Sequence, residues 1–137
     1  MNLYTARISC RDPDAVDISR AGCDRLRKAK KPAPGEFLAP SAGLVFPALR
    51  RMTDAVTASE RQAVWADYSA DYRLEMLASW KNRRAEWEAF LQRVRAVMCC
   101  YCVPVNGVLR CHRVLAARYL THLGATYCGE IEEATHA

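Results

Sequence analysis

The chain has 137 residues, of which 51% are apolar and 26% are charged, and its formal net charge is +5. This length and composition suit one hydrophobic core and exclude two ordinary domains, so we expect residues 1–137 to form a single domain. The sequence contains neither an apolar run near the roughly 18 residues that cross a bilayer nor the features of a secretory signal. We therefore expect a cytoplasmic protein with no membrane partner. The moderate positive charge favours phosphate-bearing partners but does not mark a dedicated nucleic-acid binder.

The first forty residues are expected to combine short extended pieces with a long loop. β-branched and aromatic residues in LYTARISC predict a strand over residues 3–10, and AVDIS predicts a short extended piece over residues 15–19. The basic run RLRKAKK and the PAPG that follows it predict an irregular, Pro-rich loop over residues 24–40. This loop is either a solvated connection or an arm that touches nucleic-acid phosphates.

Three helices are expected in the middle of the chain. Ser41 can cap a helix through LVFPALRRM, and Thr57 or Ser59 can cap the next one. The second helix carries an aromatic stripe at spacings of three and four residues, which indicates a buried face. That stripe consists of Trp65, Tyr68, Tyr72 and Met76. In the third helix, RAEWEAFLQRVR, the expected inner stripe consists of Trp87, Phe90, Leu91 and Val94.

The last third of the chain predicts a strand, a loop, a helix and a final strand. AVMCCYCVPV is a nearly continuous apolar run, which is typical of a parallel strand with helices above and below it. CHRVLAARYLTHLG predicts a helix that ends at Gly124, and ATYCGEI predicts a short last strand. The order of elements predicts an α/β fold, a small Rossmann-like three-layer sandwich with a mostly parallel sheet.

Seven cysteines, an odd number, lie mostly in apolar surroundings, so we expect free thiols and no disulfide framework. Four of them lie in CCYCVPVNGVLRCHR, residues 99–113. In a strand, Cys99 and Cys102 point to opposite faces, which argues against a metal knuckle of the C-x-x-C type. Cys102, Cys111 and His112 can still converge as three ligands of an open zinc site, but the favoured expectation is no metal and no cofactor.

The triplet Cys111, His112 and Arg113 is expected to open a helix, where unpaired amides and the helix dipole attract anions. At this position a Cys111 thiolate would be stabilised, His112 would stay neutral, and Arg113 could hold a phosphate or carboxylate. The alternative is structural, with Cys111 packed inward and His112 bonded to a neighbouring carbonyl. Ligands of open parallel sheets bind at the carboxyl ends of the strands. The residues that could face Cys102 and His112 across such a cleft are Arg7, Arg11, Asp17, Ser19 and Arg20.

Several segments, in chain order, resemble the uncharacterised bacterial and phage family catalogued as domain of unknown function 488. They are YTARIS at the start, DISR at residues 17–20, FLAPS at residues 37–41, and CYC followed by a loop and CHRVLAARYL. The resemblance implies a Rossmann-like α/β fold, with Cys102, Cys111, His112 and Arg113 as motif positions, and it carries no established activity. The loop VPVNGVLR is longer and more apolar than the family's version, and the basic segment before FLAPS is an insertion.

The leading hypothesis is a domain that binds a phosphate-bearing ligand, a nucleotide or a nucleic-acid end, at the helix opened by Cys111. If the protein is an enzyme, which the sequence leaves open, Cys111 or Cys102 would be the nucleophile and His112 the base. Arg113 and Arg7 would hold the anion. The other residues assigned to ligand binding are Asp17, Ser19, Arg20 and Ser41.

The alternative hypothesis is a non-catalytic interaction protein, encoded by a phage, that contacts a host protein or nucleic acid. In that case the cysteines merely fill the core, and all of them should react slowly with thiol reagents.

Overall fold

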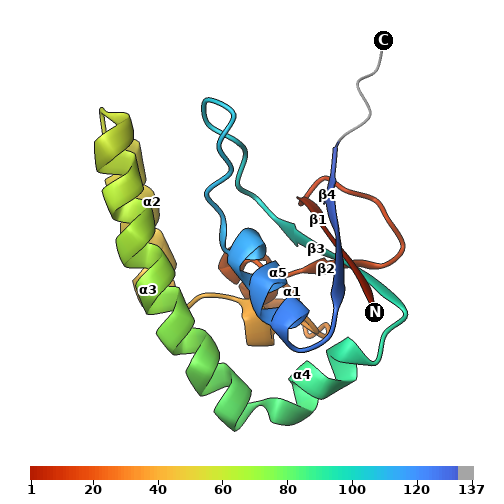
Figure 1. The fold of residues 1–137 in the computed structure, drawn as a ribbon. Helices are drawn as coiled ribbons and strands as arrows, with labels where there is room; N and C mark the ends of the chain where they lie inside the picture. Colours follow the sequence, from red (N-terminus) through yellow and green to blue (C-terminus); the bar gives the residue numbers. More distant parts are fainter. Residues whose placement is uncertain (133–137) are drawn as a thin grey trace.

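The computed structural model describes residues 1–132 and shows an α/β fold (Figure 1). Its sheet has the strand order β2-β3-β1-β4, and every strand pair is parallel. The strands are β1 (Asn2–Arg7), β2 (Ala15–Asp17), β3 (Arg95–Cys100) and β4 (Thr126–Ile131). The predicted α/β class and parallel sheet are confirmed. Each strand overlaps a predicted segment, although β1 and β3 begin one residue earlier than predicted, at Asn2 and Arg95, and end before the predicted segments do.

Three of the helices begin at a side chain that caps them, and Ser19 is the cap of α1. Ser41 caps α2 by accepting a hydrogen bond from the Leu44 amide, and Thr57 caps α3 in the same way. The helices are α1 (Arg20–Lys28), α2 (Ala42–Asp54), α3 (Ala58–Asn82), α4 (Arg84–Leu91) and α5 (His112–His122), with a short 3-10 helix, η1 (Glu36–Leu38). Within residues 1–132, no helix is both long enough and apolar enough to cross a membrane.

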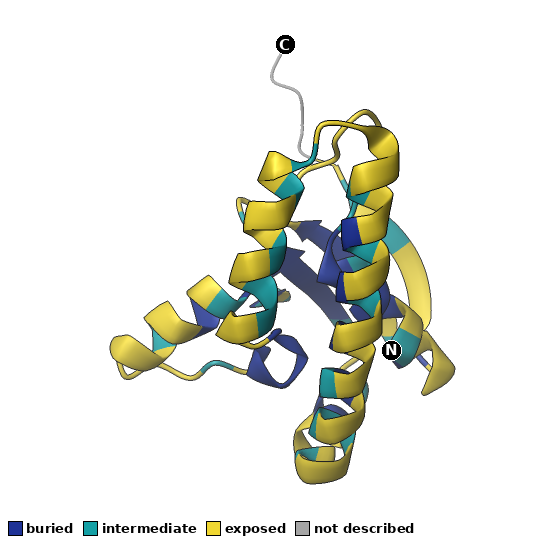
Figure 2. Ribbon diagram, turned by 90° about the vertical axis from the view of Figure 1, so that its left-hand side faces the viewer, coloured by how far each residue is buried: buried dark blue, intermediate teal, exposed yellow. Residues whose placement is uncertain are grey.

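The fold has three layers, which are the sheet, the helix α5 and the α2–α3 hairpin. α5 packs on β1, β3 and β4, and α3 packs on α5 and η1. The main hydrophobic core fills the space between these layers and includes Leu3, Met98, Leu120 and Tyr72. Figures 1 and 2 show that the helices lie on one side of the sheet, with the α2–α3 hairpin outermost.

The second face of the sheet is covered by a loop, so the expectation of helices on both faces is wrong. Ala6, Val97 and Cys99 form a small buried cluster there, and residues 8–14 cross β3 on their way from β1 to β2. Arg95 holds this loop through Asp12 and Asp14, with nitrogen–oxygen distances of 2.7 and 3.1 Å. A connection of seven residues can cover this face, but it has no room for a crossover helix.

Three further expectations need correction. Residues 24–28, predicted as loop, belong to α1, because Ser19 caps this helix and the basic side chains in its last turn complement the helix dipole. The PAPGEFLAP segment is not a solvated loop throughout, since residues 35–40 are buried. Val94, predicted to face the core, follows α4 and is 85% exposed.

Gly35 offers a test of how tightly this buried segment packs. A Cβ atom at Gly35 would lie 2.2 Å from the Asp17 carbonyl oxygen, whereas a Cβ at Gly43 in α2 would meet nothing within 4 Å. We expect Gly35→Ala to lower the free energy of unfolding by about 1–3 kcal/mol through overpacking. Gly43→Ala, the matched control, should raise it by about 0.5 kcal/mol. Urea denaturation measures both, and equal effects of the two substitutions would contradict the close packing.

Candidate functional site

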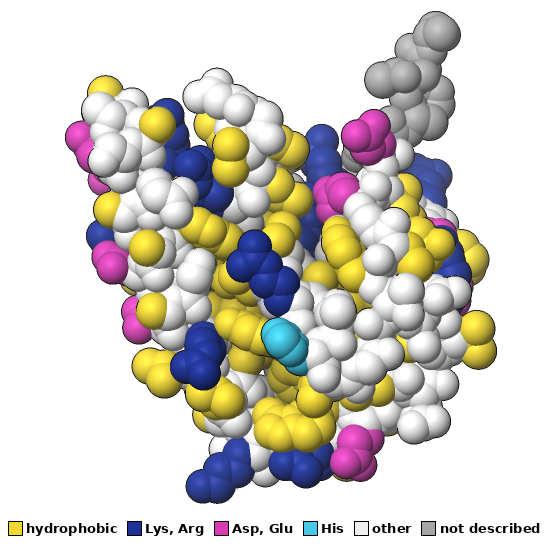
Figure 3. Space-filling view, viewed as in Figure 1, with side chains coloured by type: hydrophobic (Ala, Val, Ile, Leu, Met, Phe, Trp, Pro, Cys, Tyr) yellow, Lys and Arg dark blue, Asp and Glu magenta, His cyan; other side chains and the backbone are white. Residues whose placement is uncertain are grey.

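A cleft lies at the carboxyl ends of the strands, between the α2–α3 hairpin and the first turns of α1 and α5. It has a volume of about 240 Å³. Its outer wall is apolar and includes Phe46 and Leu49 of α2 and Trp65 of α3, and its floor includes Cys100, Cys111 and His112. Figure 3 shows hydrophobic side chains along the groove between the hairpin and the rest of the molecule, with basic side chains beside it. The predicted location of a cleft, at the ends of parallel strands, is where the structure has one.

The strand, loop and helix around the cysteines are arranged as predicted. β3 ends at Cys100, and α5 begins at His112 with Cys111 at its N-cap position. Between them the chain forms a small hairpin that is closed by the pair Val105 and Val108. Its turn residues, Asn106 and Gly107, have φ values of 51° and 76°, which suit asparagine and glycine. This hairpin brings Cys102 back towards the start of α5.

Three thiols and one imidazole meet at the floor of the cleft. The Sγ atoms of Cys100 and Cys111 lie 3.8 and 3.9 Å from Nδ1 of His112. Cys102 lines the same part of the cleft as Cys100 and Cys111. Cys100 and Cys111 are buried, and Cys102 is half-buried and lines the cleft. We call these four side chains, Cys100, Cys102, Cys111 and His112, the thiol cluster.

The structure reverses the expected acidity of the two candidate nucleophiles. Burial and the neighbouring thiols raise the pKa of Cys111 well above its ordinary value, which does not support the predicted Cys111 thiolate. Hydrogen bonds from Cys100 and Cys111, with a further contribution from the charge of Arg113, lower the pKa of Cys102 to about 3. The dipole of α5 stabilises a Cys111 thiolate less than burial destabilises it, because a buried thiolate loses its hydration.

His112 is anchored through its outer nitrogen. Nε2 lies 2.8 Å from the carbonyl oxygen of Ile18, and a carbonyl can only accept, so Nε2 carries the hydrogen. In the neutral ring Nδ1 is then an unprotonated acceptor that faces the Cys100 and Cys111 sulfurs. The bond to Ile18 matches the structural alternative for His112, and it also leaves a nitrogen lone pair directed at the thiols.

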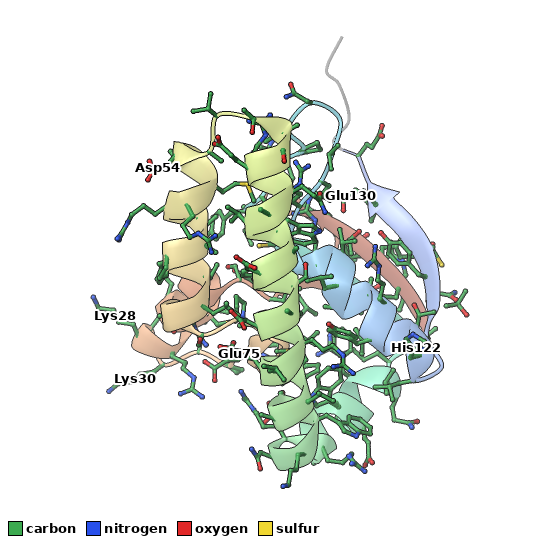
Figure 4. The ribbon with its side chains drawn as sticks, turned by 60° about the vertical axis from the view of Figure 1, so that its left-hand side comes forward. Lys28, Lys30, Asp54, Glu75, His122 and Glu130 are labelled. Carbon is green, nitrogen blue, oxygen red and sulfur yellow. The ribbon has the colours of Figure 1, made fainter. Side chains whose placement is uncertain are left out.

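Arg113 does not bind a ligand in the cleft. Its side chain is fully buried, and its guanidinium donates to both carboxylate oxygens of Glu130 at 3.1 and 2.7 Å and to the Cys102 carbonyl at 2.9 Å. Figure 4 shows Glu130 on β4, the strand that follows α5. The Arg113 guanidinium thus forms its hydrogen bonds within the protein, and these bonds connect β4 to the loop that carries Cys102.

The other residues predicted to bind the ligand have mostly structural partners. Ser19 caps α1, and its hydroxyl donates to Asp17 at 2.6 Å. Arg20 reaches the cleft wall, but its guanidinium bonds to Asp24 and to the buried Glu36.

Ser41 and Arg7 lie away from the cleft. The Ser41 amide and hydroxyl donate to Glu75, which Figure 4 labels on α3. Arg7 is exposed at the end of β1, and neither residue is among those that line the cleft. Ser41 is used as a helix cap, and Arg7 lies at the exposed end of β1 outside the lining of the cleft, so neither supports the predicted ligand-binding role.

The sequence analysis missed Arg110, which the structure places at the cleft. Within residues 1–132, its Nε atom is buried and has no hydrogen-bond partner. Its Nη2 atom lies 3.5 Å from the side-chain oxygen of Gln62 on α3, at the outer limit of a hydrogen bond. The position of Arg110, directly before the Cys-His-Arg triplet, was the available signal.

Comparisons with family models, with curated proteins and with solved structures found no match to this chain. The fold and the site therefore define the class by themselves. The chain is a small parallel α/β domain with an apolar cleft and a cluster of three thiols and one histidine at the ends of its strands.

The seven thiols should differ sharply in reactivity. Burial raises the pKa of both Cys23 and Cys99 to about 12, so at pH 8 only about one molecule in ten thousand carries either thiolate. Cys128 is exposed on β4. We expect iodoacetamide to modify Cys128 within minutes in the native protein, and Cys23 and Cys99 only after unfolding, as peptide mass spectrometry would show. Rapid modification of Cys23 in the folded state would contradict its burial.

Proposed function

We propose that the cleft binds a small phosphate-bearing ligand of the nucleotide class. The observation that carries this proposal is the buried, unpartnered Nε of Arg110 at the cleft. A buried donor without an acceptor is costly, and a phosphate oxygen would satisfy it with a charge-assisted hydrogen bond.

Two helix termini support an anion at the same place. Ser19 to Ala21 and Cys111 to His112, the first residues of α1 and α5, both line the cleft. The first amides of a helix have no partners within the helix, and the helix dipoles add positive potential there. Arg113, buried and paired with Glu130, contributes none of this binding, which replaces the earlier role predicted for it.

The opposite wall supports an apolar or aromatic body on the ligand. Phe46 is 44% exposed and Leu49 is 47% exposed, although both are large apolar residues. Together with Trp65 they offer a surface on which a planar base can pack. The volume of about 240 Å³ lies just below the range of roughly 300–1,000 Å³ typical of small-molecule sites, so a mononucleotide suits the cleft better than a dinucleotide.

Nucleotide binding is tested by thermal unfolding with AMP, ATP, adenosine and inorganic phosphate as separate probes. We expect AMP or ATP to stabilise the protein by about 2.7 kcal/mol at a hundred times its dissociation constant. Adenosine and inorganic phosphate should each bind more weakly. Adenosine lacks the phosphate that would contact Arg110, and inorganic phosphate lacks the base that would pack on the apolar wall.

The matched variants are Arg110→Ala and Arg118→Ala. Arg118 is exposed on α5 and lines a different surface hollow. Arg110→Ala should weaken nucleotide binding about tenfold or more, the usual loss for a hydrogen bond to a charged group, whereas Arg118→Ala should leave it unchanged. The absence of any shift with all four probes, or equal affinities of the two variants, would refute the proposal and favour an interaction protein.

A further inference from the structure

We infer that the thiol cluster is a zinc site in which Cys100, Cys102, Cys111 and Nδ1 of His112 are the four ligands. The inference does not depend on the proposed nucleotide binding. It revises the expectation of no metal, which came from the spacing of Cys99 and Cys102. The residue missing from that reasoning was Cys100, which points to the same face as Cys102.

The geometry of the donor atoms fits a tetrahedral ion. One potential donor atom each from Cys100, Cys111 and His112 lie within 4.8 Å of one another. Zinc–sulfur and zinc–nitrogen bonds of about 2.3 and 2.0 Å in a tetrahedron separate sulfur from nitrogen by about 3.5 Å. The sulfur–nitrogen distances here are 3.8 and 3.9 Å, so only small side-chain shifts are needed for binding.

We infer that Cys102 is the fourth donor. Its sulfur lies outside the set of three donor atoms that are within 4.8 Å of one another, so its side chain must turn towards the ion on binding. Cys102 is half-buried and lines the cleft beside Cys100 and Cys111. Three sulfurs and one imidazole nitrogen form a closed donor set of the kind that holds structural zinc. Soft sulfur donors without carboxylates disfavour magnesium and calcium, which prefer oxygen.

Hydrogen bonds that orient two of the inferred ligands, His112 and Cys102, are already present. The Nε2–H group of His112 donates to the Ile18 carbonyl at 2.8 Å, which fixes the ring with Nδ1 towards the sulfurs. Histidines that bind metals usually have such a partner for the other nitrogen. Arg113 donates to the Cys102 carbonyl at 2.9 Å and so holds the backbone of one ligand.

The charges of the site are also balanced. Zinc with three thiolates carries one net negative charge, and the thiol protons leave to solvent on binding. The amides at the start of α5 and the Arg113 guanidinium lie beside this charge and oppose it. The start of α5 would then face the zinc–thiolate centre, which leaves Arg110 and the start of α1 for the anion of a ligand in the cleft.

The expected consequence is structural. Cys102 and Cys111 lie at the two ends of the hairpin of residues 103–110, which carries Arg110 at the rim of the cleft. A shared ion would join the end of β3 to the start of α5 and fix both ends of this hairpin. Removal of zinc by a chelator should therefore expose residues 103–110 to proteolysis.

The first test uses the wild-type protein, purified without a histidine tag under reducing conditions. Metal analysis should find one zinc per chain. X-ray absorption at the zinc edge should show three sulfurs at about 2.3 Å and one nitrogen at about 2.0 Å. A metal-free protein that does not take up added zinc, a disulfide within the cluster, or a different metal would overturn the inference.

The second test compares Cys100→Ser and Cys102→Ser with Cys128→Ser, a control at an exposed thiol outside the cluster. The first two should lose most of the bound zinc to a competing chelator, while the control keeps it. Retention of zinc in all three would refute this ligand set. If a cluster variant fails to fold, cobalt substitution in the wild type remains decisive, because sulfur-to-cobalt absorption reports the thiolate ligands directly. All measurements are made without nucleotide, so their failure leaves the proposed function untouched.

Discussion

Replacing Glu130 with alanine should lower the free energy of unfolding by about 3 kcal/mol, a large part of the stability of a domain of this size. The Arg113 side chain is fully buried, and Glu130 is its charged partner at 2.7 Å. Without Glu130, the Cys102 carbonyl is the one acceptor that residues 1–132 leave to the buried guanidinium. Breaking a buried ion pair from one side is costly for this reason, whereas an exposed pair contributes little.

A double-mutant cycle with Arg113→Met separates the pair from its surroundings. Arg113→Met alone should cost less, about 1–2 kcal/mol, because the Glu130 side chain is 29% exposed and can be hydrated. The double variant should lose less stability than the two single variants combined. Urea denaturation at pH 7 measures all four proteins, and additive losses would show that the pair is not coupled.

The effect of Glu130→Ala should also depend on pH. Burial raises the pKa of the Glu130 carboxyl, but hydrogen bonds from Arg113 and Thr5 and the charge of Arg113 outweigh it, so the pKa is lowered from 4.5. A lowered pKa adds stability that is present above the unfolded value and is lost as the pH falls through the folded value. The difference between wild type and variant should therefore shrink below about pH 4.5, where the unfolded carboxyl begins to take up protons.

Trp87→Ala should destabilise the protein by about 3–5 kcal/mol, the usual cost of removing a large aromatic side chain from a core. Trp87 is 1% exposed, and its ring meets Phe37 and Trp80 edge-on with centroid distances of 5.1 and 5.7 Å. Its indole nitrogen donates to the Ser79 hydroxyl at 3.0 Å, and this hydroxyl donates to the Phe37 carbonyl. The residue therefore joins α4, the end of α3 and η1.

Two controls isolate this packing. Leu74→Ala on α3 removes a side chain that is 62% exposed and should change the stability by less than about 0.5 kcal/mol. Trp87→Phe keeps much of the ring contact and loses the hydrogen bond to Ser79, so we expect an intermediate cost of about 1–2 kcal/mol. A loss below about 1 kcal/mol for Trp87→Ala would show that α4 does not pack on the core as described.

The strands and most helices were predictable because their signals are local. The aromatic stripe of α3 follows helical spacing, and Tyr68, Tyr72 and Met76 are buried as that spacing predicts. Alternation in β3 placed Cys99 and Cys100 on opposite faces, and the structure puts them in different environments. The loop predicted over residues 24–28 was wrong because the run of basic residues was taken as a sign of a loop. The signal for a helix there was Ser19, which caps α1. The resemblance to the family of domain of unknown function 488 stays a prediction.

The position of the site at the start of α5 could be predicted from the sequence, but the roles of its residues could not. A helix that opens at Cys111 beside a strand end follows from sequence, since helix starts and strand ends have local signatures. Whether Arg113 faces a ligand or Glu130 depends on where β4 lies, and that is settled by packing between segments distant in sequence. The same holds for Arg110, whose environment includes Gln62 on α3.

The α/β class, the parallel sheet and the start of α5 after Cys111 could be predicted from local sequence signals, because propensity, periodicity and capping act over a few neighbouring residues. The tertiary structure decided which thiols meet. Cys100, Cys102 and Cys111 come together only because the hairpin of residues 103–110 folds back and because Ile18, almost a hundred residues away, holds the His112 ring in place. Burial then sets the acidity of each thiol, and burial is a property of the whole packed chain.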